Sequence, residues 1–123
     1  MKVLWIDFID RFYCLQYPIK KLTQEGFEVS TFEWFNPEIG DLDINGAINA
    51  AKEVDLVIVH FGSIPRGQAA EILARIKATK VKIIVNSVSS VLFEAADEVI
   101  GTPLNFGEEL VECVNRVIPK NRS

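Results

Sequence analysis

A chain of 123 residues has the size of one domain, and its composition, 49% hydrophobic and 24% charged residues, is that of an ordinary globular protein. Its 13 basic and 17 acidic residues give a formal net charge of −4, without the basic cluster of a nucleic-acid interface. No apolar run is long enough to span a membrane, and the first residues do not resemble a signal peptide. We therefore expect one cytoplasmic domain, residues 1–123, that binds neither nucleic acid nor membranes.

The cysteine and histidine content bounds the metal and redox chemistry of the chain. Cys14 and Cys113 lack the CxxC spacing of metal or redox motifs, and His60 is the single histidine. We expect both cysteines to be apolar residues on helices, and we expect neither a metal site nor a cofactor.

The first third of the chain predicts a strand, a helix and a second strand. Residues 3–6 form a continuous apolar run, which is typical of a central strand covered on both faces. Residues 15–22 have helical spacing, but they include Pro18, so we expect the helix to kink or restart there. Gly26 fits the end of this helix, and residues 27–32 alternate between apolar and polar, as in a strand nearer an edge.

Three more strands and two helices are predicted in the rest of the chain. Residues 54–59 form the strongest candidate for a buried strand, and shorter runs predict strands at 81–85 and 98–100. An apolar stripe predicts a helix over 66–78. A C-terminal helix is predicted to begin with a capping box at 105–108 and to end before the proline at 119.

Strands that alternate with helices indicate an α/β fold. We expect a three-layer sandwich with a flavodoxin-like, five-stranded parallel sheet in the order 2-1-3-4-5. In that topology a ligand site lies beyond the carboxyl ends of the first and third strands. The loops at that edge are residues 7–11, 60–66, 86–90 and 101–106.

Four stretches of the sequence resemble the receiver domain of bacterial response regulators. They are KVLWID, QEGFEV, DLVIVHFGSIP and ADEVIGTPLNFGEEL, and the resemblance extends over nearly the whole chain. The last is the most specific, because receivers have an acidic pair, a short strand, a Lys-Pro dipeptide and then a phenylalanine at a helix start. The dipeptide here is Thr102-Pro103. The resemblance implies a CheY-like fold and a role in bacterial signal transduction.

The same resemblance implies where a phosphoryl-transfer site would lie. Receivers use a phospho-accepting carboxylate, two acidic residues that hold Mg²⁺, a hydroxyl and a lysine, which together neutralise the charge of the transferred group. The matching positions hold His60 for the acceptor, Asp7 and Phe8 for the acidic pair, Ser87 for the hydroxyl and Thr102 for the lysine.

Three of these five groups are missing from the chain, at His60, Phe8 and Thr102. Asp7 remains, with Asp10 as a displaced substitute, and one or two carboxylates seldom hold Mg²⁺ without a phosphate to help. We therefore expect the aspartyl-phosphate switch to be lost. Asp97 follows Ser87 by only ten positions, so the fourth helix of the receiver fold is expected to be shortened.

The retained polar residues each have more than one interpretation. His60 fits a hydrogen-bonded structural residue best, and a pH-sensitive switch, a general base beside Asp7 and direct phosphorylation are the alternatives. Asp7 suits a turn cap and a functional site equally. Ser87 fits a helix cap or an anion site.

An enzyme is the alternative from a different class. In SIPRGQAAEI, Gly67 and Glu71 have a spacing that resembles nucleoside deoxyribosyltransferase-like enzymes, in which the glutamate is the nucleophile. Glu71 also suits the solvent face of its helix. Small-molecule binding in the crevice at Asp7 and His60 is a further alternative, although the loops there have few of the glycines that cradle phosphate.

We favour a pseudo-receiver that is not an enzyme and that acts by binding a protein partner, with a homodimer left open. The resemblance places its output surface around Val91, Val99, Leu104, Phe106 and Glu109. It also implies that Pro103 follows a cis peptide bond.

Two aromatic residues are further candidates for contact with a partner. Trp34 and Phe35 lie in a long predicted connection, residues 33–43, where we expect them either at the edge of the core or facing a partner.

Overall fold

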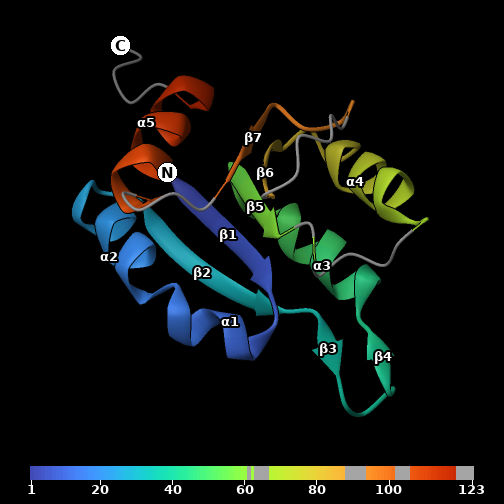
Figure 1. Ribbon diagram of the computed structural model, residues 1–123. Coiled ribbons are helices and arrows are strands. Elements are labelled where there is room, and N and C mark those ends of the chain that lie inside the picture. The colour runs from blue at the N-terminus through green and yellow to red at the C-terminus, as the bar shows by residue number, and fades with distance from the viewer. Residues whose placement is uncertain (61, 63–66, 88–93, 102–105, 119–123) are drawn as a thin grey trace.

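In a computed structural model of the chain, five parallel strands form one sheet in the order β2-β1-β5-β6-β7 (Figure 1). Counted along the chain, this is the predicted order 2-1-3-4-5, so the predicted α/β fold is confirmed. The structure describes residues 1–60, 62, 67–87, 94–101 and 106–118. The strands are β1 (Lys2–Asp7), β2 (Glu28–Glu33), β5 (Leu56–His60), β6 (Lys82–Asn86) and β7 (Glu98–Ile100).

Helices cover both faces of this sheet, which makes three layers (Figure 1). One face packs against α1, α2 and α5, and the other packs against α3 and α4. The helices are α1 (Ile9–Cys14), α2 (Gln16–Gln24), α3 (Ile44–Ala51), α4 (Ala69–Lys77) and α5 (Phe106–Val117). None of the helices in the described part of the chain is long and apolar enough to cross a membrane.

Strand β1 contributes to both apolar cores, because successive side chains of a strand point to opposite faces. Leu4 and Ile6 are buried under α3 and α4, whereas Val3 and Trp5 are buried under the helices of the other face. This explains why residues 3–6 form a continuous apolar run, as predicted for a central strand.

The helix predicted to kink or restart at Pro18 is broken at Leu15 instead, and α2 runs through Pro18. α1 ends at Cys14 and α2 begins at Gln16, so Pro18 is the third residue of α2, where its missing N–H has no intrahelical partner to lose. Gly26, two residues after α2, has a φ of +94°, the left-handed conformation that glycine adopts most easily. The prediction for Gly26 is confirmed, whereas the helix restarts at Gln16 and not at Pro18.

The segment between β2 and β5 contains two elements that the sequence patterns did not predict. A small antiparallel hairpin pairs β3 (Phe35–Asn36) with β4 (Asp41–Leu42), and α3 follows it directly. Asp43 caps α3, because its side chain accepts a hydrogen bond from the Gly46 N–H (2.9 Å). α3 lacks a stripe of large apolar residues, and this is the reason it was not predicted.

Trp34 and Phe35 divide between the two locations expected for them, and the expectation for Cys14 was wrong. Trp34 is completely buried, so it is not a partner-facing side chain, whereas Phe35 beside it is 43% exposed. Cys113 is an apolar core residue as expected, and burial raises the pKa of its thiol to about 11. Cys14 is exposed, because it lies on the outer face of the short helix α1.

Several predictions fall outside the described residues. These are the shortened fourth helix at 88–93, the cis bond before Pro103, and the roles of Val91, Thr102 and Leu104.

Candidate functional site

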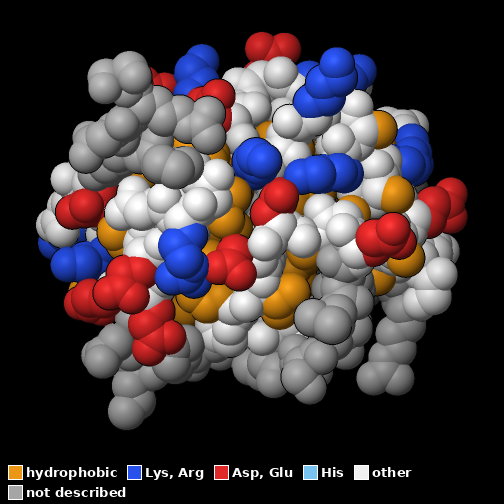
Figure 2. Space-filling model, turned by 90° about the horizontal axis from the view of Figure 1, so that it is seen from above, with side chains coloured by type: hydrophobic (Ala, Val, Ile, Leu, Met, Phe, Trp, Pro, Cys, Tyr) orange, Lys and Arg blue, Asp and Glu red, His pale blue; other side chains and the backbone are white. Residues whose placement is uncertain are grey.

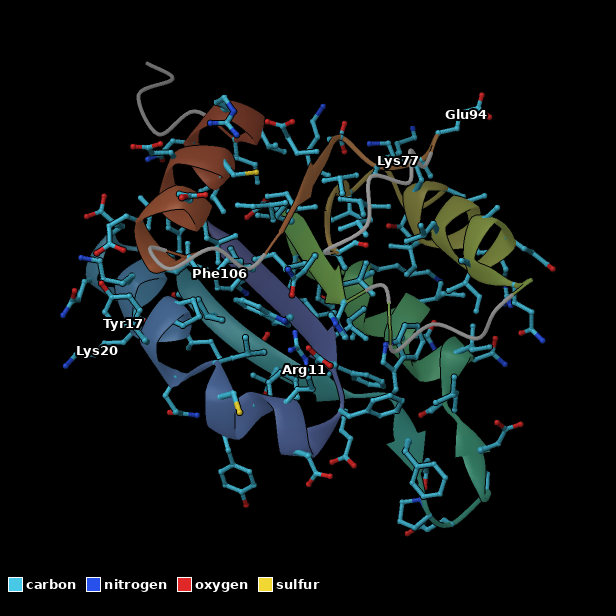
Figure 3. The ribbon with its side chains drawn as sticks, viewed as in Figure 1. Arg11, Tyr17, Lys20, Lys77, Glu94 and Phe106 are labelled. Carbon is cyan, nitrogen blue, oxygen red and sulfur yellow. The ribbon has the colours of Figure 1, made fainter. Side chains whose placement is uncertain are left out.

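Four polar side chains gather at the carboxyl edge of the sheet, where the topology predicted a site. Asp7, His60 and Asn86 are the last residues of β1, β5 and β6, and the parallel register aligns these strand ends. Arg11 comes from α1, and Figure 3 shows it lying beside the end of β1.

Arg11 pairs with Asp7, the buried carboxylate of this site. Its Nε donates to Asp7 Oδ2 (3.2 Å), and its Nη2 donates to Asn86 Oδ1 (3.0 Å). Asp7 is completely buried, and its Oδ1 also accepts a hydrogen bond from the Phe8 N–H (2.8 Å). A buried carboxylate is costly unless it is paired, so Arg11 supplies the cation that Asp7 requires.

Asn86 connects this pair to the last strand of the sheet. Its side chain is completely buried, and its Nδ2 donates to the main-chain carbonyls of Ile100 (3.1 Å) and Gly101 (3.3 Å). The N–H of the neighbouring Ser87 donates to the same Ile100 carbonyl (2.9 Å). The Asp7–Arg11–Asn86 chain of hydrogen bonds therefore reaches from β1 to the end of β7.

The sequence patterns placed Arg11 and Asn86 in crevice loops but gave neither a role. The i, i+4 spacing of Asp7 and Arg11 was an available signal for the ion pair. The contact between Arg11 and Asn86 joins residues 75 positions apart, so no local pattern pointed to it.

His60 lies beside the Asp7–Arg11 ion pair, and its imidazole is uncharged at neutral pH. Its Nδ1 is 3.7 Å from Asp7 Oδ1, and its side chain is 25% exposed. Burial lowers the pKa of the imidazole below its ordinary value of 6.5, the positive charge of Arg11 lowers it further, and Asp7 opposes them. A Cβ at Gly62 would lie 2.8 Å from His60 Cε1, so the ring occupies the space that this glycine leaves.

The lowered pKa of His60 makes stability depend on pH. The unfolded chain binds this proton more tightly than the folded chain, so the contribution of neutral His60 is complete above about pH 6.5 and is lost as the pH falls through the folded-state pKa. We expect the wild-type chain to lose more unfolding free energy than His60→Gln between about pH 7.5 and pH 5. Urea unfolding at both pH values measures this, and equal losses in the two proteins would contradict it.

The other receiver positions do not supply the missing carboxylates. Phe8 is partly buried and packs against the core under α3 and α4, and Ser87 is buried beside Asn86. Asp10 is exposed on α1 and forms no hydrogen bond or ion pair within the described residues. No group of three His, Cys, Asp or Glu side chains in the described part of the chain could hold a metal ion.

The predicted output surface is only partly on the outside of the molecule. Phe106 is buried with its ring edge-to-face to Trp5 at 6.2 Å, so it is a core residue and not an interaction residue. Val99 is partly buried and packs against the core under α3 and α4, whereas Glu109 is exposed.

Glu71 is exposed in the first turn of α4, as the solvent-face interpretation expected. A groove of about 650 Å³ lies on the same helix, away from the strand ends of the Asp7 site. Its lining includes Leu73 and Lys77 of α4 and Glu94, and Figure 3 shows Lys77 and Glu94 at the same end of α4. None of the polar strand-end residues lines this groove.

Comparison with known proteins shows which fold this is. No protein-family model matches the sequence, and no curated protein matches it. Among solved structures, it is similar to a response regulator from Desulfuromonas acetoxidans, with 18% identity, a TM-score of 0.70 and 95% of each chain covered. It is also similar to the chemotaxis protein CheY4 of Vibrio cholerae, with 20% identity and a TM-score of 0.67 over 95% of this chain and 98% of that one.

A third similar structure is a CheY-like receiver domain protein from Methanospirillum hungatei JF-1, with 19% identity and a TM-score of 0.66 over 94% of this chain and 90% of that one. At these identities the likeness establishes the fold. The chain therefore has the receiver fold, as the sequence resemblance implied.

Proposed function

We propose that this chain is a pseudo-receiver, a signalling or regulatory module that works by binding a protein partner and has lost Mg²⁺-dependent aspartyl phosphorylation. The receiver fold supports the signalling role. The contents of the strand-end crevice support the loss of phosphoryl transfer.

The observation that carries this proposal is the Arg11–Asp7 ion pair. In a receiver the strand-end acids hold Mg²⁺, and the metal together with a lysine neutralises the transferred phosphoryl group. Here Arg11 already occupies one carboxylate oxygen of Asp7, and the Phe8 N–H occupies the other. His60 stands at the acceptor position, and its imidazole supplies no carboxylate to form an aspartyl phosphate.

A phosphodonor assay tests the loss of phosphoryl transfer. We expect the intact mass of the chain to stay unchanged after incubation with acetyl phosphate and Mg²⁺, because the acceptor carboxylate and the second acidic residue are missing. A receiver domain that keeps all five groups, treated in parallel, must gain the mass of a phosphoryl group. Added mass on this chain that His60→Gln or Asp7→Asn abolishes would overturn the proposal.

A further inference from the structure

The outer edge of β2 has backbone hydrogen-bonding groups that the described chain does not use. The Glu28 N–H donates to the carbonyl that precedes β1 (2.9 Å), and the Trp34 N–H donates to the carbonyl of the last residue of β1 (3.2 Å). Even-numbered residues of β2 therefore face β1, because backbone groups alternate in direction along a parallel strand. The groups of Val29, Thr31 and Glu33 point away from the sheet, and their N–H groups have no partner within the described residues.

This edge also lacks several of the features that protect an edge strand from pairing, although a glutamate stands at each of its ends. β2 has six residues without lysine or proline, and its register with β1 continues from Glu28 to Glu33 without a bulge. Ser30 and Thr31 point to opposite faces, and both are exposed, so the edge is accessible from either side. The opposite edge strand, β7, has only three residues.

The segment of the chain that forms this edge is strongly acidic, and the register places one basic residue, Lys2 of β1, beside Glu28. Residues 22–51 contain six acidic residues and no basic residue, although the net charge of the whole chain is only −4. Glu28 and Glu33 are the two ends of β2, and the exposed Glu38 and Asp41 follow in the hairpin. The charge distribution differs on the face of the molecule away from the hairpin. Figure 2 shows both signs of charge intermixed on that face.

The hairpin adds apolar surface directly after the strand. Phe35 is 43% exposed and Ile39 is 60% exposed. Figure 1 shows the hairpin projecting beyond the carboxyl end of β2. A strand edge and exposed apolar side chains thus follow one another along the same segment.

We propose that β2 and the β3–β4 hairpin, here named the β2 edge surface, bind an extended basic segment of a partner protein as an added strand. The segment's N–H and C=O groups bond to Val29, Thr31 and Glu33, and its lysine or arginine residues pair with Glu28 and Glu33. Apolar residues of the partner segment, beyond the part that pairs with β2, contact the hairpin. This inference rests on the proposed function and names the class of partner.

A second copy of the chain fits this surface less well. Pairing two β2 strands edge to edge would bring the acidic residues of both copies together, from Glu25 to Asp41 of each. Repulsion between like charges opposes such an association. A basic segment removes this repulsion, and this is the reason for choosing it as the occupant.

Peptide selection on the full chain tests the proposal. We expect short peptides selected from a random library to be enriched in lysine and arginine around β-branched residues. In calorimetric titrations, Thr31→Pro should weaken binding of such a peptide about tenfold or more, because it removes an outward N–H. Thr31→Ala keeps that N–H and is the matched control, which should bind like the wild-type chain.

A second variant, Glu28→Lys/Glu33→Lys, tests the contribution of charge, and we expect it to lose affinity for the basic peptides. This test does not require Thr31→Pro to fold. Proline is accepted at edge positions whose N–H faces solvent, and circular dichroism checks its folding. The proposal is wrong if no peptide is enriched, if the selected peptides are not basic, or if binding survives in both variants. It is equally wrong if the wild-type chain forms a dimer that Thr31→Pro dissolves. None of these binding results depends on whether the chain can be phosphorylated. The phosphodonor assay therefore tests the loss of phosphoryl transfer separately.

Discussion

Replacing Arg11 with methionine is expected to destabilise the fold by about 2–3 kcal/mol, because it leaves Asp7 buried, charged and without its cation. Removing one partner of a fully buried ion pair costs more than this, but the Arg11 side chain is 31% exposed and water reduces the effect. Methionine keeps much of the apolar stem of arginine, so the loss reports the charge and its hydrogen bonds. Urea unfolding at neutral pH measures it.

Arg116→Met provides a matched control. Arg116 pairs with Glu98 at 2.8 Å, but its side chain is 60% exposed and water screens the pair, so its removal should destabilise the fold less than the removal of Arg11 does. Asp7→Asn combined with Arg11→Met completes a double-mutant cycle, in which we expect the two changes to be coupled by about 1–2 kcal/mol. Equal losses for Arg11→Met and Arg116→Met, or an additive cycle, would show that the pair is not what stabilises Asp7.

The Trp34→Ala variant is expected to lose about 3–5 kcal/mol of unfolding free energy, the cost of removing a large buried side chain. Trp34 is completely buried in the core under α3 and α4. The main-chain N–H of Trp34 donates to the Asp7 carbonyl (3.2 Å), and the main-chain carbonyl of Trp34 accepts from the Asp43 N–H (2.8 Å). Trp34 thus joins the end of β1 to the cap of α3.

Phe35→Ala is the control one residue away. Phe35 is 43% exposed, so its truncation should change stability by no more than about 0.5 kcal/mol. Trp34→Phe should fall between the two, because it keeps a ring in the core and removes the indole Nε1, which is buried without a hydrogen-bond partner in the described chain. Thermal and urea unfolding of the three variants give the order, and a small loss for Trp34→Ala would mean that this side chain does not support the core.

The sheet could be predicted from the sequence because its central strands are buried on both faces. Continuous apolar runs at β1, β5 and β6 reflect that burial directly. α3 was not predicted, because INGAINAA packs through the small side chains of Ala47 and Ala51. The hairpin was not predicted either, since each of its strands has only two residues, too few for a pattern.

The candidate site was predictable in position and not in its bonding. Topology alone placed Asp7 and His60 at the same edge of the sheet. The sequence could not show that the Arg11 guanidinium bridges Asp7 and Asn86, because this depends on how α1 packs beside the strand ends. The burial that lowers the pKa of His60 is likewise a property of the folded chain.

The most direct test of the pseudo-receiver account is an amide-shift NMR titration of the chain with Mg²⁺ and beryllofluoride, which mimics the phosphoryl group of an aspartyl phosphate. The account predicts no saturable shifts around Asp7, His60 and Ser87, because Arg11 holds the remaining carboxylate and no acceptor carboxylate is present at His60. Saturable shifts at these three residues would show that a phosphoryl site has survived, and would contradict the account.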